Sequence, residues 1–498
     1  MPPWMTAPNL APAPLPVAVV MVAALGAFGV GWTVWRLLGW SRRDGGPALL
    51  AAGGLGLVLM GYAVLALGLL GLLSPGTLVA VPLVFLLASA ASLGRVLRRL
   101  RETVSQVGRA VAWSPNRALY AAALVWLALT LLGGLGPADA RDWDGLSEHL
   151  AQAKTYLRDG RVHPLWYDHH SQFPATMVML YSLGLALGGQ GAAKLFHWTF
   201  ALMSLLAVRH LARRHLTASA GGPALAVLAT TPLVGWLATV GYVDLSSVFF
   251  CLVTANYLLS WREKGQGEDL VRAGLMAGAG MTVKMQGLFT FGVFLLALLF
   301  WAWHLRRGLR PVLVYVAVAG ALASPWYIKT WVITGNPVYP FAYGLFGGKQ
   351  WSAEQARPYA YHHAGFGYGK LPPERQWQQL SAAAKHLSGP RNPLNLFVTP
   401  FTLTLFPEYY APRQPRLTAM VMLGIGPLWL MLLPLLVLVR RKKPAAVGWL
   451  VGIFALFYLL WFETTQLERY LLPWLALLAP VAGLAVAWMW KAPRPVGT

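Results

Sequence analysis

The side chains best suited to chemistry gather in one short polar segment, ADARDWDGLSEHL, which follows an apolar run. It contains Asp139, Asp142, Asp144, Glu148 and His149. If a helix begins at Asp144, Glu148 and His149 follow about one turn later and lie near the helix face that carries Asp144. A carboxylate at the edge of an apolar run can serve as a general base, because partial desolvation raises its pKa and a nearby cation lowers it. The alternative is a solvated acidic loop in which Asp144 caps the helix.

Two further charged residues stand where apolar runs leave little room for a solvated loop. Asp244 lies in VGYVDLSSVFF and Lys284 in AGMTVKMQGLF. A charge buried in this way is costly unless it is paired or functional. We therefore expect either a structural Asp244–Lys284 pair or a functional role for these residues.

Another polar group lies near the end of the chain, in ETTQLERYLLP. Arg469 stands beside Glu468 and close to Glu463, at the start of the last apolar run. Its guanidinium could hold a phosphate by two parallel hydrogen bonds. The alternative is an interfacial arginine whose stem lies along apolar surface while its charge reaches water.

The histidines could add metal ligands to the first segment. Candidates to act with Asp142 or Asp144 are His163, His169, His170, His362 and His363. Their spacing matches no zinc motif, so we expect no obligatory metal, although these residue types are compatible with a divalent ion. The sequence also has no Walker loop, dinucleotide fingerprint or GxSxG elbow in a supporting context, so we expect no soluble cofactor.

The elements that must position these groups are apolar helices. The chain has 498 residues, of which 57% are hydrophobic and 11% charged, and its mean hydropathy is +0.54. A soluble domain carries about 25% charged residues. The apolar runs are about 17–25 residues long and do not alternate with polar residues, which predicts membrane-spanning helices rather than barrel strands. The expected fold class is therefore an all-α integral membrane protein.

The net charge of +23 does not indicate nucleic-acid binding. The basic residues stand in short clusters between apolar runs, as in cytoplasmic loops that face anionic lipid. With about thirteen spans every cluster falls on the same side, which places the N-terminus outside and the C-terminus in the cytoplasm. The expected spans are 15–40, 47–73, 76–94, 118–135, 192–212, 223–241, 245–260, 268–284, 286–304, 311–327, 417–439, 445–461 and 470–490.

Two long loops then lie outside, at 136–191 and 328–416. The first contains the apolar piece Pro174–Leu187, which we expect to form a re-entrant or interface-lying helix. In the second loop, apolar residues on one helical face predict another interfacial helix. These residues are Trp377, Leu380, Ala384 and Leu387.

Three parts of the chain resemble the GT-C superfamily of membrane glycosyltransferases, most closely the bacterial branch related to protein O-mannosyltransferases and lipid A aminoarabinose transferases. The first is DWDGLSEHLAQAKTYLRDGRVHP with QFPATMVMLYSLGLALGGQGAAKLFHW, the second is TTPLVGWLATVGYVDLSSVFF with AGLMAGAGMTVKMQGLF, and the third is SPWYIKTWVITGNPVYPF with QLERYLLPWLALLAP. The resemblance implies a GT-C-like catalytic bundle at 118–498, preceded by additional spans and a basic cytoplasmic loop at 1–117. It also implies a multi-pass protein of the bacterial inner membrane.

In this family an acidic residue of the first outer loop acts on the acceptor, and the sugar donor is linked to a polyprenyl phosphate in the bilayer. The resemblance assigns the acidic role to Asp144, with Asp142 as the alternative. The usual Asp-Glu pair is Asp144–Gly145 here, so the sugar and the acceptor stay unassigned. The implied reaction is transfer with inversion, in which the acidic residue is the general base.

A fixed cation should favour departure of the polyprenyl phosphate. The candidates are Arg469 and Lys284, followed by Lys329 and Arg391. Asp244, His149 and Glu468 are further site candidates. The hypothesis requires Asp144, Lys284 and Arg469 to line one water-accessible pocket beside the lipid.

Other functions stay open on the sequence, namely a transporter or lipid flippase, a polysaccharide ligase or polymerase, and a non-catalytic scaffold. A transporter would place its functional polar residues near the bilayer midplane and show paired repeats. Here the polar residues lie near one interface and no repeat is evident. The acceptor is a protein, a lipid or a glycan.

Overall fold

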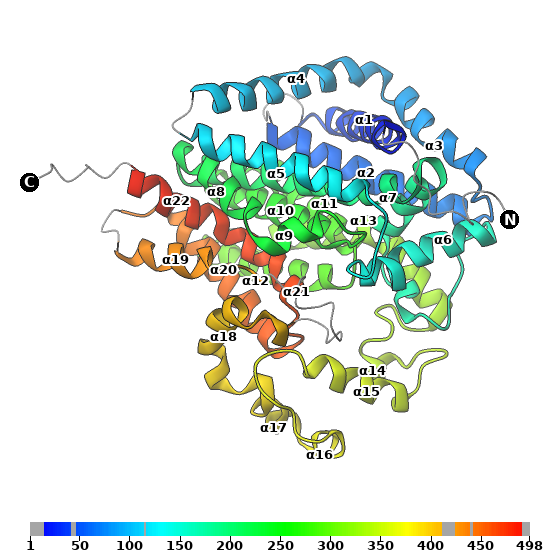
Figure 1. The fold of residues 1–498 in the computed structure, drawn as a ribbon, viewed down its shortest axis with the longest axis vertical. Helices are drawn as coiled ribbons and strands as arrows, with labels where there is room; N and C mark the ends of the chain where they lie inside the picture. The colour runs from blue at the N-terminus through cyan, green and yellow to red at the C-terminus, as the bar shows by residue number, and fades with distance from the viewer. Residues whose placement is uncertain (1–13, 41–45, 114–115, 411–423, 439–441, 491–498) are drawn as a thin grey trace, which may run out of the picture. The chain divides into compact units, whose positions relative to one another are not determined.

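The chain folds into α-helices joined by short loops. The computed structural model describes residues 14–40, 46–113, 116–410, 424–438 and 442–490, and every regular element in these residues is helical (Figure 1). The chain divides into two compact units. The first comprises Met1–Arg109, Leu127–Met203 and Trp236–Ala353, and the second comprises Ala110–Trp126, Ser204–Gly235 and Glu354–Thr498. The predicted division at residue 117 stays a prediction, because these units follow proximity in space rather than chain order.

Each unit is a set of packed helices. The first holds α1 (Pro14–Leu37), α2 (Gly46–Leu69), α3 (Pro75–Ala88), most of α4 (Ala90–Trp113), the end of α5 (Arg117–Leu135), α6 (Leu150–Asp159), most of α7 (Thr176–His215), the end of α9 (Pro232–Leu237), α10 (Asp244–Lys264), α11 (Gly267–Met281), α12 (Gln286–His304), α13 (Arg310–Thr334) and α14 (Tyr343–Phe346). The second holds the rest of α4, α5, α7 and α9 with α8 (Gly221–Ala229), α15 (Ala353–Ala364), α16 (Glu374–Gln379), α17 (Ala382–His386), α18 (Pro393–Leu405), α19 (Leu428–Leu438), α20 (Ala445–Glu463), α21 (Glu468–Leu475) and α22 (Ala479–Trp490).

Eight helices in the described part of the chain are long and apolar enough to cross a membrane. They are α1, α2, α5, α7, α12, α13, α20 and the stretch Glu468–Trp490. The bent pair of α3 and α4 would make nine. The predicted all-α membrane fold class is thus confirmed, whereas the count of thirteen spans is not.

Three expected spans account for much of this difference. The span 223–241 is broken into α8 and α9 before Pro232, whose ring removes a backbone N–H and disfavours helix in the preceding residue. The span 268–284 is α11, which has only 15 residues. The span 417–439 lies partly outside the described residues, and its described part, α19, has 11 residues. Helices as short as α8, α9 and α11 cannot cross the hydrocarbon core straight.

The apolar piece Pro174–Leu187 lies largely in the first part of α7. At Gly189 the backbone leaves the helical conformation, with φ 71° and ψ −166°, which glycine adopts at low cost. A Cβ on Gly184 would lie 2.6 Å from Cα of Ala193, so the two parts of α7 pack closely beside this bend. The first part is buried within the protein, as Leu180 illustrates. Its position relative to the bilayer stays a prediction.

The prediction of a single interfacial helix over Trp377–Leu387 is wrong. Two short helices, α16 and α17, take its place, because the chain is extended at Leu380, with ψ 141°. The Ser381 side chain then accepts a hydrogen bond from the N–H of Ala384 and starts α17 as its N-cap.

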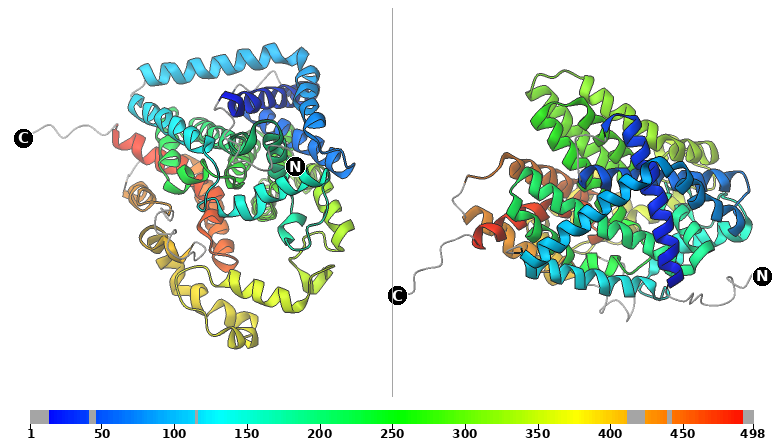
Figure 2. Two further views of the ribbon diagram at one scale, coloured as in Figure 1. Left: turned by 45° about the vertical axis from the view of Figure 1, so that its right-hand side comes forward. Right: turned by 90° about the horizontal axis from the view of Figure 1, so that it is seen from above.

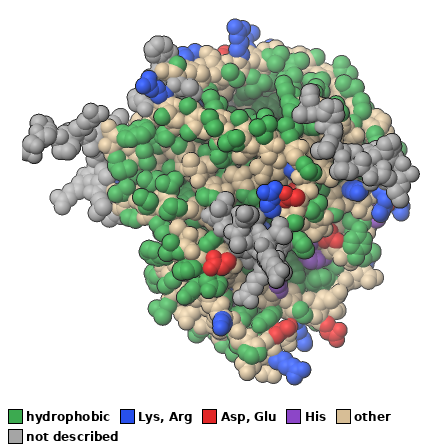
Figure 3. Space-filling view, viewed as in Figure 1, with side chains coloured by type: hydrophobic (Ala, Val, Ile, Leu, Met, Phe, Trp, Pro, Cys, Tyr) green, Lys and Arg blue, Asp and Glu red, His purple; other side chains and the backbone are tan. Residues whose placement is uncertain are grey.

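Apolar side chains cover much of the described surface on the face seen in Figure 3. Exposed apolar side chains also occur on α12 and α13, where Trp303 is 75% exposed and Leu313 is 66% exposed. Exposed apolar surface of this extent is costly in water but suits a surface in contact with lipid tails.

A close helix contact in the first unit joins α1 to α2 through small residues. A Cβ on Gly31 would lie 1.8 Å from the carbonyl oxygen of Ala52, and a Cβ on Gly56 would lie 1.8 Å from that of Ala27. The two backbones therefore touch where both helices lack side chains. Small residues drive this close packing in membranes, where apolar burial gives no net gain.

We expect Gly31→Val or Gly56→Val to force α1 and α2 apart. Overpacking of this kind lowers the free energy of unfolding by about 1–3 kcal/mol. Thermal unfolding of the purified protein in detergent measures the loss. Gly292→Val on α12 is the matched control, because a Cβ there meets nothing within 4 Å. Equal melting temperatures for all three variants would contradict the close α1–α2 contact.

Candidate functional site

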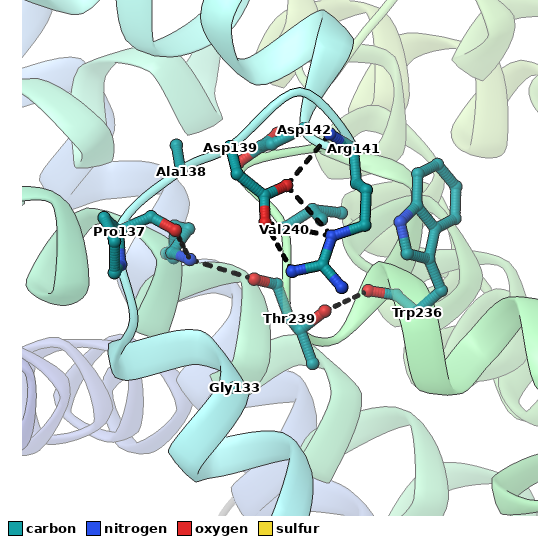
Figure 4. Close-up of a pocket in the computed structure, with 10 residues that line it drawn as sticks. Gly133, Pro137, Ala138, Asp139, Arg141, Asp142, Trp236, Thr239 and Val240 are labelled. Carbon is teal, nitrogen blue, oxygen red and sulfur yellow. Dashed lines mark hydrogen bonds and ion pairs between the residues drawn. The ribbon is translucent and has the colours of Figure 1, made fainter. Parts of the chain in front are cut away.

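Segments of the first unit that are far apart in sequence meet around a small cavity (Figure 4). They are the loop between α5 and α6, the turn between α9 and α10, and α7 just after its bend. The cavity has a volume of about 210 Å³. Its lining residues are Gly133, Pro137, Ala138, Asp139, Arg141, Asp142, Lys194, Trp236, Thr239 and Val240.

Asp142 is the buried carboxylate of this cavity, with only 1% of its surface exposed. Its Oδ2 accepts a hydrogen bond of 2.8 Å from the backbone N–H of Gly241. Its Oδ1 forms no hydrogen bond of ordinary geometry among the described residues, although the nearby Gly145 N–H also favours the ionised carboxylate and so acts to lower its pKa. One carboxylate oxygen is therefore fixed by the protein, while the other keeps its capacity to accept a hydrogen bond.

Burial raises the pKa of Asp142 to about 6. The Gly241 N–H and the Lys194 ammonium act against this rise because both favour the ionised carboxylate, whereas the charge of Asp144 adds to it. A carboxylate with a pKa of about 6 is ionised at neutral pH and is a stronger base than an ordinary aspartate. This property suits general-base catalysis.

Gly145 leaves the room that this carboxylate needs. A Cβ on Gly145 would lie 2.0 Å from Oδ1 of Asp142, well inside van der Waals contact. Any larger residue at 145 would displace the Asp142 side chain. A glutamate at position 145, as in an Asp-Glu pair, would therefore clash with the Asp142 carboxylate in this chain, whereas Gly145 does not.

Lys194 places a positive charge next to the cavity. Lys194 is buried, with 2% of its surface exposed. Its ammonium donates hydrogen bonds to the carbonyl oxygens of Thr239, at 3.1 Å, and Pro137, at 3.5 Å. It ties both flanking loops to α7 and stabilises the ionised form of Asp142. The sequence interpretation missed Lys194, although a charged residue within the predicted span 192–212 was the signal that could have found it.

Arg141 brings a second cation to the cavity from its more exposed side. Its guanidinium forms an ion pair with Asp139 through two nitrogen atoms, and both side chains are about half exposed. The Arg141 guanidinium lowers the pKa of Asp139, which stays ionised. An exposed pair adds little stability, but it fixes a planar donor group at the cavity.

The turn that supplies Gly241 is held by two buried side chains of α7. Nδ1 of His197 lies 3.1 Å from the carbonyl oxygen of Val240, and its Nε2 accepts the backbone N–H of Leu245 at 3.0 Å. Since Nε2 accepts, Nδ1 carries the proton and the ring is neutral. The Tyr181 hydroxyl donates to the carbonyl oxygen of Tyr242. These bonds fix the Gly241 N–H that holds Asp142.

Asp144 lies outside the cavity lining and does not cap a helix. Its φ of −65° and ψ of −31° are helical and its side chain makes no capping hydrogen bond, so the cap interpretation is wrong. The following turn, Gly145–His149, is a π-helix, which is wider than an α-helical turn. This turn brings Asp144, Glu148 and His149 together, with ligand atoms within 4.8 Å of one another.

A second group of possible ligands, Asp168, His169 and His170, lies next to the first. Nδ1 of His170 is 3.0 Å from Asp168 and 3.5 Å from Glu148. Burial alone would lower the pKa of His170, but the hydrogen bond to Asp168 and the charge of Glu148 raise it overall. Both groups offer the carboxylate and imidazole donors that suit a divalent ion.

The other candidate histidines are not members of either group. His163 contacts Asp159 at 2.9 Å instead. His362 and His363 lie in α15, in the second unit.

Asp244 and Lys284 meet as a buried ion pair. Asp244 begins α10, Lys284 lies between α11 and α12, and the ammonium is 2.6 Å from Oδ1 of Asp244. The Asp244 side chain is fully buried, and that of Lys284 is 13% exposed. The proximity expected from the sequence is therefore observed, and Lys284 already has a carboxylate partner.

Glu468 and Arg469 lie in the second unit, at the start of α21. The backbone N–H of Glu468 donates to the carbonyl oxygen of Tyr410 at 3.1 Å, and its side chain is buried. The guanidinium of Arg469 lies 5.1 Å from the ring centre of Tyr470, within the range of a cation–π contact.

The two weaker cation candidates, Lys329 and Arg391, donate hydrogen bonds to backbone carbonyl oxygens. Lys329 donates to that of Ser171 at 3.3 Å. Arg391 donates through three nitrogen atoms to those of Ala364, Glu463 and Thr464. Their donors are used to join loops within their own units, which leaves Arg391 in particular little capacity for a ligand.

The common pocket expected for Asp144, Lys284 and Arg469 stays a prediction. The cavity of Figure 4 is lined by neither Asp144 nor Lys284, and Arg469 belongs to the second unit. What the structure does bring together in the first unit is Asp142 with Lys194 and the Asp139–Arg141 pair.

Residues 174–328 match the sequence profile of the dolichyl-phosphate-mannose-protein mannosyltransferase family. The resemblance to GT-C glycosyltransferases is confirmed over this segment. The match covers less than half of the chain and includes Lys194, His197, Asp244 and Lys284, while Asp142 precedes it.

A similar solved structure is that of ArnT from Cupriavidus metallidurans, bound to undecaprenyl phosphate. The TM-score is 0.46 and the sequence identity 16%, and the comparison covers 74% of this chain and 59% of that chain. This chain therefore spans less than two thirds of that protein. No curated protein sequence matches the chain.

We expect Asp244→Asn to destabilise the first unit, because it leaves the Lys284 ammonium without its charged partner. Removing one member of a buried pair costs about 3–5 kcal/mol. The double variant Asp244→Asn with Lys284→Met should regain most of this loss, as measured by thermal unfolding in detergent. A double variant as unstable as the single one would contradict a structural role for the pair.

Proposed function

We propose that this protein is a membrane glycosyltransferase that moves a sugar from a polyprenyl-phosphate donor to an acceptor hydroxyl, with inversion at the anomeric carbon. The observation that carries the proposal is the Asp142 carboxylate, buried at a cavity with one oxygen fixed by Gly241 and the other able to accept a proton. The matched family acts from dolichyl-phosphate mannose by its own description, which supports a lipid-phosphate donor.

Asp142 is the better general base of the two carboxylates considered. It lines the cavity, its pKa is raised to about 6 by burial, and Gly145 preserves the space around it. Asp144 instead shares its surroundings with Glu148 and His149. In this assignment Asp144 supports the local charge arrangement, and it takes the base role only if Asp142 is dispensable.

The reaction then follows from where charge moves. The ionised Asp142 accepts the proton of the acceptor hydroxyl as its oxygen attacks the anomeric carbon. The bond from that carbon to the phosphate oxygen breaks, and the electron pair leaves with the polyprenyl phosphate. Because the donor already carries an activated phosphate linkage, no soluble nucleotide is needed. The absence of a nucleotide motif in the sequence agrees with this.

A cation next to the departing phosphate would stabilise the transition state more than the ground state. Arg469 is the first candidate, because a guanidinium can bind a phosphate through two parallel hydrogen bonds. Lys284 is the second, although Asp244 competes for its charge at 2.6 Å. Lys194 and Arg141 line the same cavity as Asp142 and therefore suit the acceptor side of the site.

The reacting groups belong on the non-cytoplasmic face in this proposal. The clusters of arginine and lysine between apolar runs fall on the opposite side by the positive-inside rule. The donor's lipid tail keeps its phosphate at the membrane surface, which is where a loop such as that between α5 and α6 can reach it.

We expect Asp142→Asn to lower sugar transfer by about 10²–10⁴-fold, the usual contribution of a general base. The assay follows radiolabelled polyprenyl-phosphate mannose, and then other polyprenyl-phosphate sugars, in membranes that contain the variant. Wild-type kcat/KM should rise with pH through about 6, as Asp142 loses its proton. In Asp142→Glu the pH at which kcat/KM rises should shift.

Asp144→Asn is the matched control and should retain more transfer than Asp142→Asn. Full activity in Asp142→Asn together with loss in Asp144→Asn would exchange the two roles. Full activity in both variants would remove the proposed base altogether.

We expect Arg469→Ala to lower kcat/KM for the donor by about 10²–10³-fold, because the charge that develops on the phosphate loses its partner. Arg469→Lys should recover part of the rate, because the lysine ammonium keeps the positive charge but cannot form the two parallel hydrogen bonds of a guanidinium. Arg375→Ala, an exposed position of the second unit, is the matched control. Unchanged donor kinetics in Arg469→Ala would exclude this residue from the phosphate site.

A further inference from the structure

Helix α4 takes the place of the basic loop expected after the third span. It follows α3 at an angle of 83°, and Ser89 lies between the two helices. Figure 2 shows the bend in the ribbon. The stretch Ala90–Arg109 belongs to the first unit and contains five arginines and one acidic residue, Glu102. The sequence interpretation treated this stretch only as one of several basic cytoplasmic loops, and the proposed transferase function gives the helix no role.

The side chains of α4 separate into an apolar stripe and a basic face. Apolar residues recur every three or four positions, which places them on one side of the helix. They are Leu93, Val96, Leu97, Leu100, Val104 and Val107. The arginines fall between them and face away, at Arg95, Arg98, Arg99, Arg101 and Arg109.

Part of the apolar stripe is exposed in the protein. Val96 is fully buried, whereas Leu97 is 48% exposed and Val104 is 71% exposed. One edge of the stripe thus packs on the protein, and the other edge is open. In water this surface would be unfavourable, but in a protein of membrane-spanning helices it can enter the lipid.

The basic face is largely without acidic partners in the described structure. Arg99 pairs with Glu102 at 3.1 Å, while Arg95 and Arg109 donate to the uncharged oxygens of Ala91 and Ser105. Along the edge of the molecule where α4 lies, the charged groups visible in Figure 3 are mostly Lys and Arg. Such a face is complementary to anionic groups.

The start of α4 is anchored, so its direction is set by the protein. Ser92 Oγ lies 2.9 Å from the Thr33 hydroxyl of α1, and the Arg36 guanidinium donates to Ser92 Oγ at 3.3 Å. A Cβ on Gly29 of α1 would lie 2.3 Å from Cβ of Ser89, so the corner packs directly on α1. Helix α4 therefore leaves the end of α3 at a fixed angle.

We propose that α4 lies in the membrane surface and binds the phosphate groups of anionic phospholipids through its arginines. Its open apolar edge enters the boundary between head groups and acyl chains, and its basic face collects the anionic lipids of that leaflet. By the positive-inside rule this leaflet is the cytoplasmic one. The helix thus fixes the depth and orientation of the first unit in the bilayer, whatever reaction the protein catalyses.

The depth of α4 can be measured with a single fluorescent label. Cys251 is the chain's one cysteine and is buried, so Cys251→Ser gives the background for Val104→Cys and, as a matched control on the polar side, Ser105→Cys. In nanodiscs an environment-sensitive dye at 104 should emit at shorter wavelength than at 105 and be quenched by spin-labelled acyl chains. Equal, water-like emission at both positions would overturn the proposal.

The lipid preference is tested with the triple variant Arg95→Gln, Arg98→Gln and Arg101→Gln. Each arginine near an anionic surface contributes about fivefold to binding. The triple variant, once purified, should therefore bind phosphatidylglycerol on the order of a hundredfold more weakly than the wild type. Its binding of phosphatidylcholine should be unchanged. Arg357→Gln, Lys370→Gln and Arg375→Gln together remove the same charge elsewhere and serve as control. Equal loss in both triple variants, or none in the first, would overturn the proposal, as would stoichiometric binding of nucleic acid or protein in place of lipid.

Discussion

The hydrogen bond from the Gly241 N–H to the Asp142 carboxylate is the constraint on which the candidate site depends. It joins two segments 99 residues apart in sequence. An ionised carboxylate this deeply buried would cost several kcal/mol without a compensating donor. The donor is itself held in place by α7, through Lys194 at Thr239 and His197 at Val240 and Leu245. One helix therefore sets both the position and the charge of the carboxylate.

The same requirement explains what most other buried charges do. Asp244 is neutralised by Lys284, and Arg391 is surrounded by three backbone carbonyl oxygens. In a buried position, the placement of a charged side chain is set first by its need for charged or hydrogen-bonding partners. A basic residue in an outer loop is therefore weak evidence for a phosphate site until its donors have been accounted for.

The sequence was sufficient for the fold class and for the neighbourhood of the site, but not for its atoms. Apolar run length predicts membrane helices, and the cost of isolated charges pointed to Asp244 and Lys284 together. The proposed ranking of Asp142 above Asp144 could not be made from the sequence, because it depends on the space left by Gly145 and on a hydrogen-bond donor from a distant turn. Span counts failed where prolines break an apolar run, as at Pro232. The basic stretch at Ala90–Arg109 was misread as a loop because its arginines were counted for their side of the membrane and not for their helical spacing.

The π-helix at Gly145–His149 also affects how this chain can be compared with its relatives. A π-helical turn holds one residue more than an α-helical turn, so residues before it are shifted by one position relative to α6. Against a protein with an α-helical turn at this place, an alignment anchored on α6 and counted backwards without a gap would pair an acidic residue here with the neighbour of its spatial equivalent. For such a pair, correspondence between carboxylates has to be judged by superposition of coordinates.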